Sequence, residues 1–267
     1  MVAKVKYPNL RFLCRLYKTS FKQVMALKTS FFLRILFMII NNLIMLVGWF
    51  AVFNTFKTIN GWSFSDFMFM TGLVVTCFSI WSLFFRGAGI YMARLIEYGD
   101  LDTYLMAPKN ILLHTTCSQT DPAGFGDLLS GIILLTASGL ISFSNIGILL
   151  FCILIGASLF VSLGIFLGAL NFYASDCTDF GERLFYLFLS ITGYPGCIYT
   201  GLAKLILISL FPAGLISILP VEQIHHPDTM TLLWMFFVSY VLLTGSILFF
   251  YNGLKRYESG NRIGGKL

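Results

Sequence analysis

Residues 86–110 read RGAGIYMARLIEYGDLDTYLMAPKN and carry six charged side chains between two long apolar regions. Within residues 91–98, apolar side chains recur at i, i+4 and i+7, which predicts a short amphipathic helix. Gly99 is typical of a residue that ends such a helix, Asp100 is placed to cap a second turn, and Pro108 stops that turn. The stretch therefore predicts a short, bent element in contact with water.

The composition of the whole chain is that of a membrane protein. Of its 267 residues, 57% are hydrophobic and only 11% are charged, and the mean hydropathy is +0.83. A soluble domain carries roughly 25% charged residues. Helices satisfy their own backbone hydrogen bonds inside a bilayer, so we expect an all-α, polytopic membrane protein. No polar stretch is long enough for a separate core, and residues 1–267 are expected to form one transmembrane domain.

Six apolar stretches predict membrane-spanning helices, because a bilayer core of about 30 Å needs about 20 residues of helix. They cover about residues 31–56, 64–85, 127–143, 147–172, 184–196 and 229–251. Ahead of them, residues 10–28 place a basic stripe opposite an aromatic face, which predicts an interfacial helix on an anionic leaflet. Ser63 and Asp66 form a capping-box pattern at the start of the second span.

The chain between the fifth and sixth spans is interrupted by glycine and proline residues. Non-helical backbone at membrane depth is tolerated only where protein or water covers it. We therefore expect residues 197–220 to form short helices that re-enter the outer leaflet. Tyr194 and Pro195 stand at the start of this break.

A few polar or conspicuous residues are candidates for a pathway or a subunit interface. Asn41 and Asn42 lie well inside the first span, where an unpaired amide is costly. They either line a pathway or bond a neighbouring helix. Tyr194 and Pro195 are the other candidates. Asp179 is placed to N-cap the fifth span rather than to bind a metal, and we expect neither a metal site nor a catalytic residue.

The basic residues are distributed unevenly across the predicted membrane. Sixteen of the 18 lysines and arginines fall on one side, and Lys57 and Lys204 fall on the other. Because cytoplasmic loops are enriched in positive charge, both termini and residues 86–110 are expected in the cytoplasm. Membrane orientation thus accounts for the net charge of +6, and no nucleic-acid partner is expected.

Three motifs in this arrangement are similar to those of a known family. They are Glu97-x-Gly99-Asp100-Leu101-Asp102-x-Tyr104-Leu105-x-x-Pro108 after the second span, Tyr194-Pro195 with Ile198-Tyr199 and Pro212 after the fifth, and Arg256-Tyr257-Glu258-Ser259-Gly260-Asn261 at the end. With six spans and both termini inside, the chain resembles the permease subunits of type-2 ATP-binding-cassette (ABC) exporters over essentially its whole length.

The resemblance implies a multi-pass permease in the inner or plasma membrane of a prokaryote, with two identical or homologous permease subunits forming the pathway as a dimer. Residues 86–110 then correspond to the coupling helix that docks on a separate ABC ATPase subunit. The chain has no Walker A sequence, so ATP and Mg²⁺ are expected on that partner, with no cofactor in this chain. The coupling residues implied are Glu97, Gly99, Asp100, Leu101, Asp102, Tyr104, Leu105 and Pro108.

Two other classes stay open on the sequence. A structural or assembly membrane protein without transport activity has the same composition. A membrane-embedded enzyme needs convergent ionisable groups at membrane depth, and the spans offer essentially none.

Overall fold

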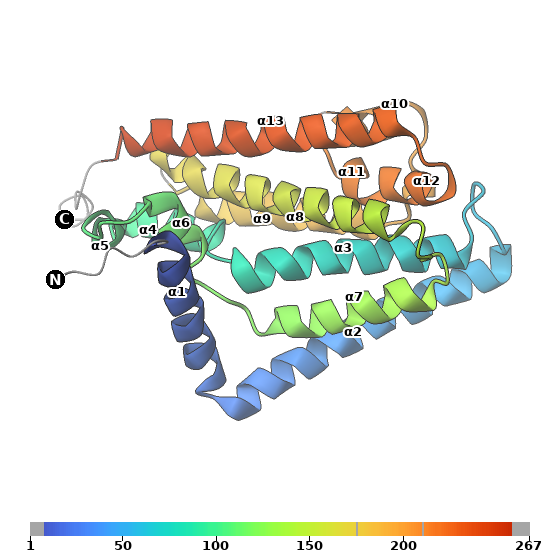
Figure 1. The fold of residues 1–267 in the computed structure, drawn as a ribbon, viewed down its shortest axis with the longest axis horizontal. Coiled ribbons are helices and arrows are strands. Elements are labelled where there is room, and N and C mark those ends of the chain that lie inside the picture. The colour runs from blue at the N-terminus through green and yellow to red at the C-terminus, as the bar shows by residue number, and fades with distance from the viewer. Residues whose placement is uncertain (1–7, 175, 210, 258–267) are drawn as a thin grey trace.

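The computed structural model describes residues 8–174, 176–209 and 211–257, and within these residues it is built of helices without β-strands (Figure 1). The long helices are α2 (Lys28–Phe56), α3 (Phe64–Phe84), α8 (Ile146–Ala169) and α13 (Thr229–Leu254). The shorter ones are α1 (Pro8–Met25), α4 (Ile90–Tyr98), α5 (Asp102–Leu105), α6 (Ile111–Thr116), α7 (Ala123–Ala137), α9 (Thr178–Gly193), α10 (Gly201–Ser209), α11 (Gly214–Ser217) and α12 (Leu219–His225). Residues 258–261 of the predicted C-terminal motif lie outside the described residues.

The all-α class and the membrane-spanning character are confirmed. Four helices of the described chain, α2, α3, α8 and α13, are long and apolar enough to cross a bilayer. The helices α7 and α9 have 15 and 16 residues and run along the same bundle (Figure 1). The count of six spans stays a prediction.

The helix α3 lies at the centre of the bundle, and α2 lies at its edge. Of the 18 consecutive residues that form the most apolar part of each helix, 72% are buried in α3, mainly against α7 and α8, but only 6% are buried in α2. Large apolar side chains of α2 are therefore exposed, among them Phe37, Ile44 and Val47. In a membrane, this face of α2 contacts lipid or another subunit.

The third predicted span, 127–143, is shifted in the structure, where α7 covers Ala123–Ala137. The helix begins earlier because the Oδ1 atom of Asp121 accepts a hydrogen bond from the backbone N–H of Ala123 at 3.0 Å. It ends earlier because Gly139 adopts a left-handed conformation with φ +69°.

The fifth predicted span, 184–196, also starts earlier, since α9 begins at Thr178. The predicted N-cap Asp179 therefore lies inside the first turn, and Cys177 occupies the N-cap position without a side-chain hydrogen bond. An acidic side chain in the first turn still stabilises the helix through the positive end of its dipole.

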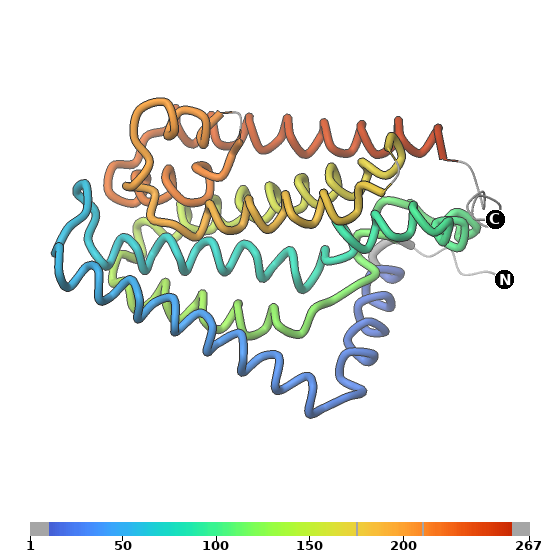
Figure 2. Tube along the Cα trace, turned by 180° about the vertical axis from the view of Figure 1, so that it is seen from behind, coloured from blue at the N-terminus to red at the C-terminus, as the bar shows by residue number. Residues whose placement is uncertain are grey.

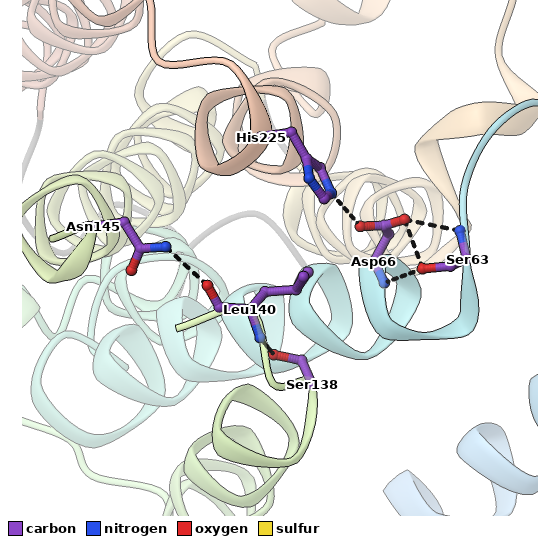
Figure 3. Close-up of polar contacts among 6 residues, drawn as sticks. All are labelled: Ser63, Asp66, Ser138, Leu140, Asn145 and His225. Atoms are coloured by element: carbon purple, nitrogen blue, oxygen red, sulfur yellow. Dashed lines mark hydrogen bonds and ion pairs between the residues drawn. The ribbon is translucent and has the colours of Figure 1, made fainter. Parts of the chain in front are cut away.

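The break between the predicted fifth and sixth spans contains short helices. The axis turns by 95° between α10 and the α11–α12 pair. Pro220 does not end the segment as expected, because it lies in the first turn of α12, where a missing N–H costs nothing, and the helix continues to His225. At the start of α3, Ser63 and Asp66 form the predicted capping box, and His225 Nε2 lies 2.5 Å from Asp66 Oδ1 (Figure 3).

The connecting segments sort to the two ends of the bundle (Figures 1 and 2). At one end lie α4, α5, α6 and the last turn of α13, and α1 crosses this end at a steep angle to the bundle axis. At the other end lie the turn after α2, the α7–α8 turn, α10 and α12. The stretch 86–110 therefore stands at the end that holds most of the basic residues.

Candidate functional site

The stretch 86–110 folds as a helix, a sharp bend and a second short helix. Gly99 adopts φ +78°, a left-handed conformation that glycine alone takes without steric cost, and it ends α4 as predicted. The backbone N–H of Leu101 donates to the carbonyl oxygen of Leu95 at 3.1 Å, which closes the bend over the end of α4. The Leu101 side chain is fully buried and holds the bend against the bundle.

The prediction that Asp100 caps the second turn is wrong. Leu101 occupies the N-cap position of α5, with no side-chain cap. Asp100 contributes its backbone carbonyl oxygen instead, which accepts from the hydroxyl and the N–H of Thr103 at 2.8 and 3.2 Å. The backbone N–H of Asp102 donates to the carbonyl oxygen of Gly99 at 3.5 Å. The start of α5 therefore does not need a side-chain acceptor.

The inner face of α4 packs on the ends of two long helices. Met92 and Ile96 are buried with Ile165 of α8 and Phe250 of α13 in one apolar cluster. A Cβ atom at Gly168 of α8 would lie 2.9 Å from the carbonyl oxygen of Gly89, so only glycine permits this close approach. The segment is therefore seated directly on α8.

Two carboxylates connect the segment to other helices. Glu97 accepts a hydrogen bond from the Thr178 hydroxyl at 2.6 Å, which joins α4 to the first turn of α9. Asp102 lies beside Tyr257, just beyond α13, and burial together with this carboxylate raises the pKa of Tyr257 to about 12. Asn110 and the Tyr251 hydroxyl of α13 exchange hydrogen bonds at 3.0 and 3.2 Å.

A chain of aromatic rings connects the segment to α1. The Tyr104 and Tyr91 hydroxyls lie 2.9 Å apart, and the Tyr104 ring meets His114 edge-on at a centroid distance of 4.6 Å. His114 in turn contacts Phe12 of α1 at 4.9 Å. Burial raises the pKa of Tyr104 to about 12 and lowers the pKa of His114, which favours the neutral ring. Tyr104 is thus half-buried within its own chain.

The outer face of the segment is left exposed. Its large side chains are Tyr98, Leu105 and Met106, with exposed fractions of 68%, 46% and 79%, and Arg94 and Asp100 flank them. We call these five residues the outer face. Sequence reasoning placed Tyr98 on the same side as Leu95 and missed Met106. Their exposure follows from the seating of α4 on α8, which no local pattern reveals.

A comparison with protein-family models matches the family described as ABC-2 family transporter protein over residues 37–261. The chain belongs to the ABC-2 family. A comparison with curated proteins gave no match. The family match covers most of α2 and every later described helix, and it establishes this chain as a multi-pass membrane transporter domain.

The other residues singled out in this ABC-2 transporter lie in the bundle, away from residues 86–110. Asn42 is buried and donates to Asp127 Oδ1 of α7 at 2.9 Å, so it bonds a neighbouring helix. Asn41 is exposed on the outer side of α2. Tyr194 is half exposed at the end of α9 and contacts the ring of Trp49 on α2, while Pro195 is buried.

Asp127 is a polar residue that sequence reasoning left at the edge of a span. In the structure it is 1% exposed, and its Oδ2 atom has no hydrogen-bond partner among the described residues. Two features of the sequence could have pointed to this contact. Asp127 directly precedes a long uncharged stretch, and Asn42, its hydrogen-bond partner, is an amide inside an apolar span.

Proposed function

We propose that this ABC-2 family chain is the transmembrane subunit of an ATP-driven exporter and that residues 86–110 couple it to a separate ATPase subunit. The observation that carries the proposal is the outer face, an exposed apolar surface on a bent segment whose inner side is packed into the bundle. Aromatic and methionine side chains are enriched at protein interfaces. Such a surface at the basic end of the molecule is suited to bind a protein partner in water.

The contacts behind the outer face suit a transmitting joint. The segment is packed on α8 and α13, hydrogen-bonded to α9 through Glu97, and joined to α1 through Tyr104 and His114. Movement of a docked partner would therefore act on four helices together. Glu97, Gly99, Leu101, Asp102 and Tyr104 form this joint in the proposal. Asp100, Leu105 and Pro108 contact the partner.

The proposal includes a dimer of permease subunits, identical or homologous, that encloses the pathway. The exposed apolar side of α2 supports this arrangement, because it carries the Asn41 amide at membrane depth, where a polar group gains from a partner helix. ATP and Mg²⁺ are placed on the ATPase subunit, and both termini of this chain lie in the cytoplasm of a prokaryotic cell.

Substitution of the outer face tests the proposed docking. Losing a buried interface anchor costs about 2 kcal/mol, or roughly thirtyfold in affinity. Tyr98→Ala and Met106→Ala are expected to reduce co-purification of the ATPase by about this factor, with unchanged membrane insertion. The matched control is Phe143→Ala, which removes a side chain of 95% exposure at the opposite end.

Two outcomes contradict the proposal. Undiminished ATPase association in both outer-face variants places the docking surface elsewhere. If the wild-type chain co-purifies with no ATPase whose turnover it stimulates, the chain acts as a structural or assembly protein instead.

A further inference from the structure

A cavity of about 320 Å³ lies between the end of α1, the start of α2 and the linker that leads to α7. Figure 2 shows α1 and α2 meeting at a corner away from the bundle, with the linker on the facing side. The polar side chains around the cavity include Gln23, Ser30, Arg34, Arg86, Gln119 and Asp121. Arg86 is the first residue of the stretch 86–110, but none of these residues belongs to its outer face, so the cavity is separate from the proposed docking surface.

The cavity carries an excess of positive charge. Arg34 and Arg86 approach a single carboxylate, Asp121, at N–O distances of 3.8 and 3.9 Å, which exceed hydrogen-bond length. The Oδ1 atom of Asp121 already accepts the N–H of Ala123. Within the described chain, neither guanidinium donates a hydrogen bond, so both retain donors for a further anion. Guanidinium groups bind phosphate oxygens through two parallel hydrogen bonds.

Apolar surface adjoins these two arginines. Val24, Leu27 and Phe31 also line the cavity, and Leu27 is 72% exposed. Beyond them, the exposed apolar side of α2 continues with Phe32 at 66%. The helix α1 crosses the bundle at this end (Figure 1). A headgroup held by the arginines would therefore have its acyl chains beside α2.

We propose that this cavity binds the phosphate of an anionic membrane lipid, with Arg34 and Arg86 as its donors. Basic pockets between membrane helices are suited to anionic headgroups. The shared chemistry is a phosphate ester, which a soluble phosphate also offers, but the adjoining apolar surface favours the lipid. The site does not depend on the proposed coupling to an ATPase.

To test this, the purified protein in detergent is titrated with phosphatidylglycerol, and its melting temperature is measured at each lipid concentration. Phosphatidylcholine with the same acyl chains is the lipid control, and inorganic phosphate is the soluble control. Phosphatidylglycerol is expected to raise the melting temperature more than either control. Arg34→Gln is expected to weaken its apparent affinity about tenfold, because a charged hydrogen bond is lost. Arg34 has a side chain of 60% exposure, so this variant is expected to fold.

Two further variants sharpen the test. Asp121→Asn keeps the oxygen that accepts from Ala123 but removes the competing charge, so it is expected to tighten binding of phosphatidylglycerol severalfold. Arg94→Gln, at an exposed arginine outside the cavity, is expected to leave affinity unchanged. Equal affinity in the wild type and Arg34→Gln overturns the proposal. Inorganic phosphate that binds as tightly as phosphatidylglycerol overturns the lipid as the ligand.

Discussion

At the scale of single residues, Gly99 determines the shape of the proposed coupling segment, residues 86–110. Its positive φ of 78° turns the chain between α4 and α5, so that Leu101 is buried while Tyr98 and Leu105 are exposed. A β-branched residue in this backbone conformation is strained, at a cost of about 1–3 kcal/mol. The bend and the exposure of the outer face thus depend on one position.

Gly99→Val is expected to destabilise the protein by about 2 kcal/mol and to abolish ATPase association, because the strained bend moves the outer face. Gly139→Val is the matched control, because Gly139 has a positive φ like Gly99 but lies at the opposite end of the bundle. A Cβ atom at Gly139 would have no neighbouring atom within 4 Å. Thermal unfolding and ATPase co-purification are the measurements. Equal retention of the ATPase by both variants would rule out the bend as a docking requirement.

At the scale of elements, the contact between α4 and α9 allows the proposed docking to be tested separately from the proposed transmission. The Thr178 hydroxyl donates to Glu97 at 2.6 Å, at the first turn of α9, whose other end contacts α2 through Tyr194 and Trp49. This hydrogen bond is charge-assisted and partly buried, which makes it worth about 1.5–3 kcal/mol. It connects the water-exposed segment with α9.

Thr178→Val removes this donor at nearly constant volume. We expect the ATPase to remain associated, while its stimulation by the permease falls about tenfold, because the outer face is intact but α9 no longer follows α4. Thr178→Ser restores the hydroxyl and is expected to restore stimulation. ATPase turnover of the purified complex is the measurement. A Thr178→Val complex with full stimulation would show that α9 takes no part in coupling.

At the scale of the whole molecule, the polar segments lie at the two ends of the helix bundle. The end with α1 and α4–α6 holds most lysines and arginines, while Lys57 and the Lys204–Glu222 ion pair, at 2.6 Å, lie at the other. Positive charge is retained on the cytoplasmic side of membranes. The proposed orientation therefore places the coupling segment in the same compartment as ATP.

Labelling with a membrane-impermeant thiol reagent tests this orientation in intact cells. On a background without the six native cysteines, Lys57→Cys, Leu202→Cys and His226→Cys are expected to react from outside. All three positions are exposed in the structure. Arg94→Cys is expected to react only after the cells are opened. External labelling at position 94 would refute a cytoplasmic coupling segment, and labelling of positions 202 and 226 from opposite sides would refute re-entry.

Features that depend on neighbouring residues were determined by the sequence alone. Apolar runs of sufficient length predicted α2, α3, α8 and α13, because a helix satisfies its own backbone hydrogen bonds in a bilayer. The end of α4 at Gly99 and the capping box of Ser63 and Asp66 were also predicted, since both depend on only a few residues of chain. The resemblance to ABC exporters rested on such local motifs, and the family match supports it.

Features that join distant parts of the chain were decided only by the tertiary structure. Glu97 meets Thr178 across 81 residues, and Asn42 meets Asp127 across 85. The exposure of Tyr98 follows from how α4 packs on α8, and the half-buried position of Tyr104 follows from its contacts with Tyr91 and His114. The first turn of α9 meets α4 through the Thr178 hydroxyl. Periodicity assigns a side chain to a face of its helix, but packing alone decides which face is covered. For that reason the sequence pointed to residues 86–110 as the segment proposed to couple, and packing decided which of its side chains form the outer face.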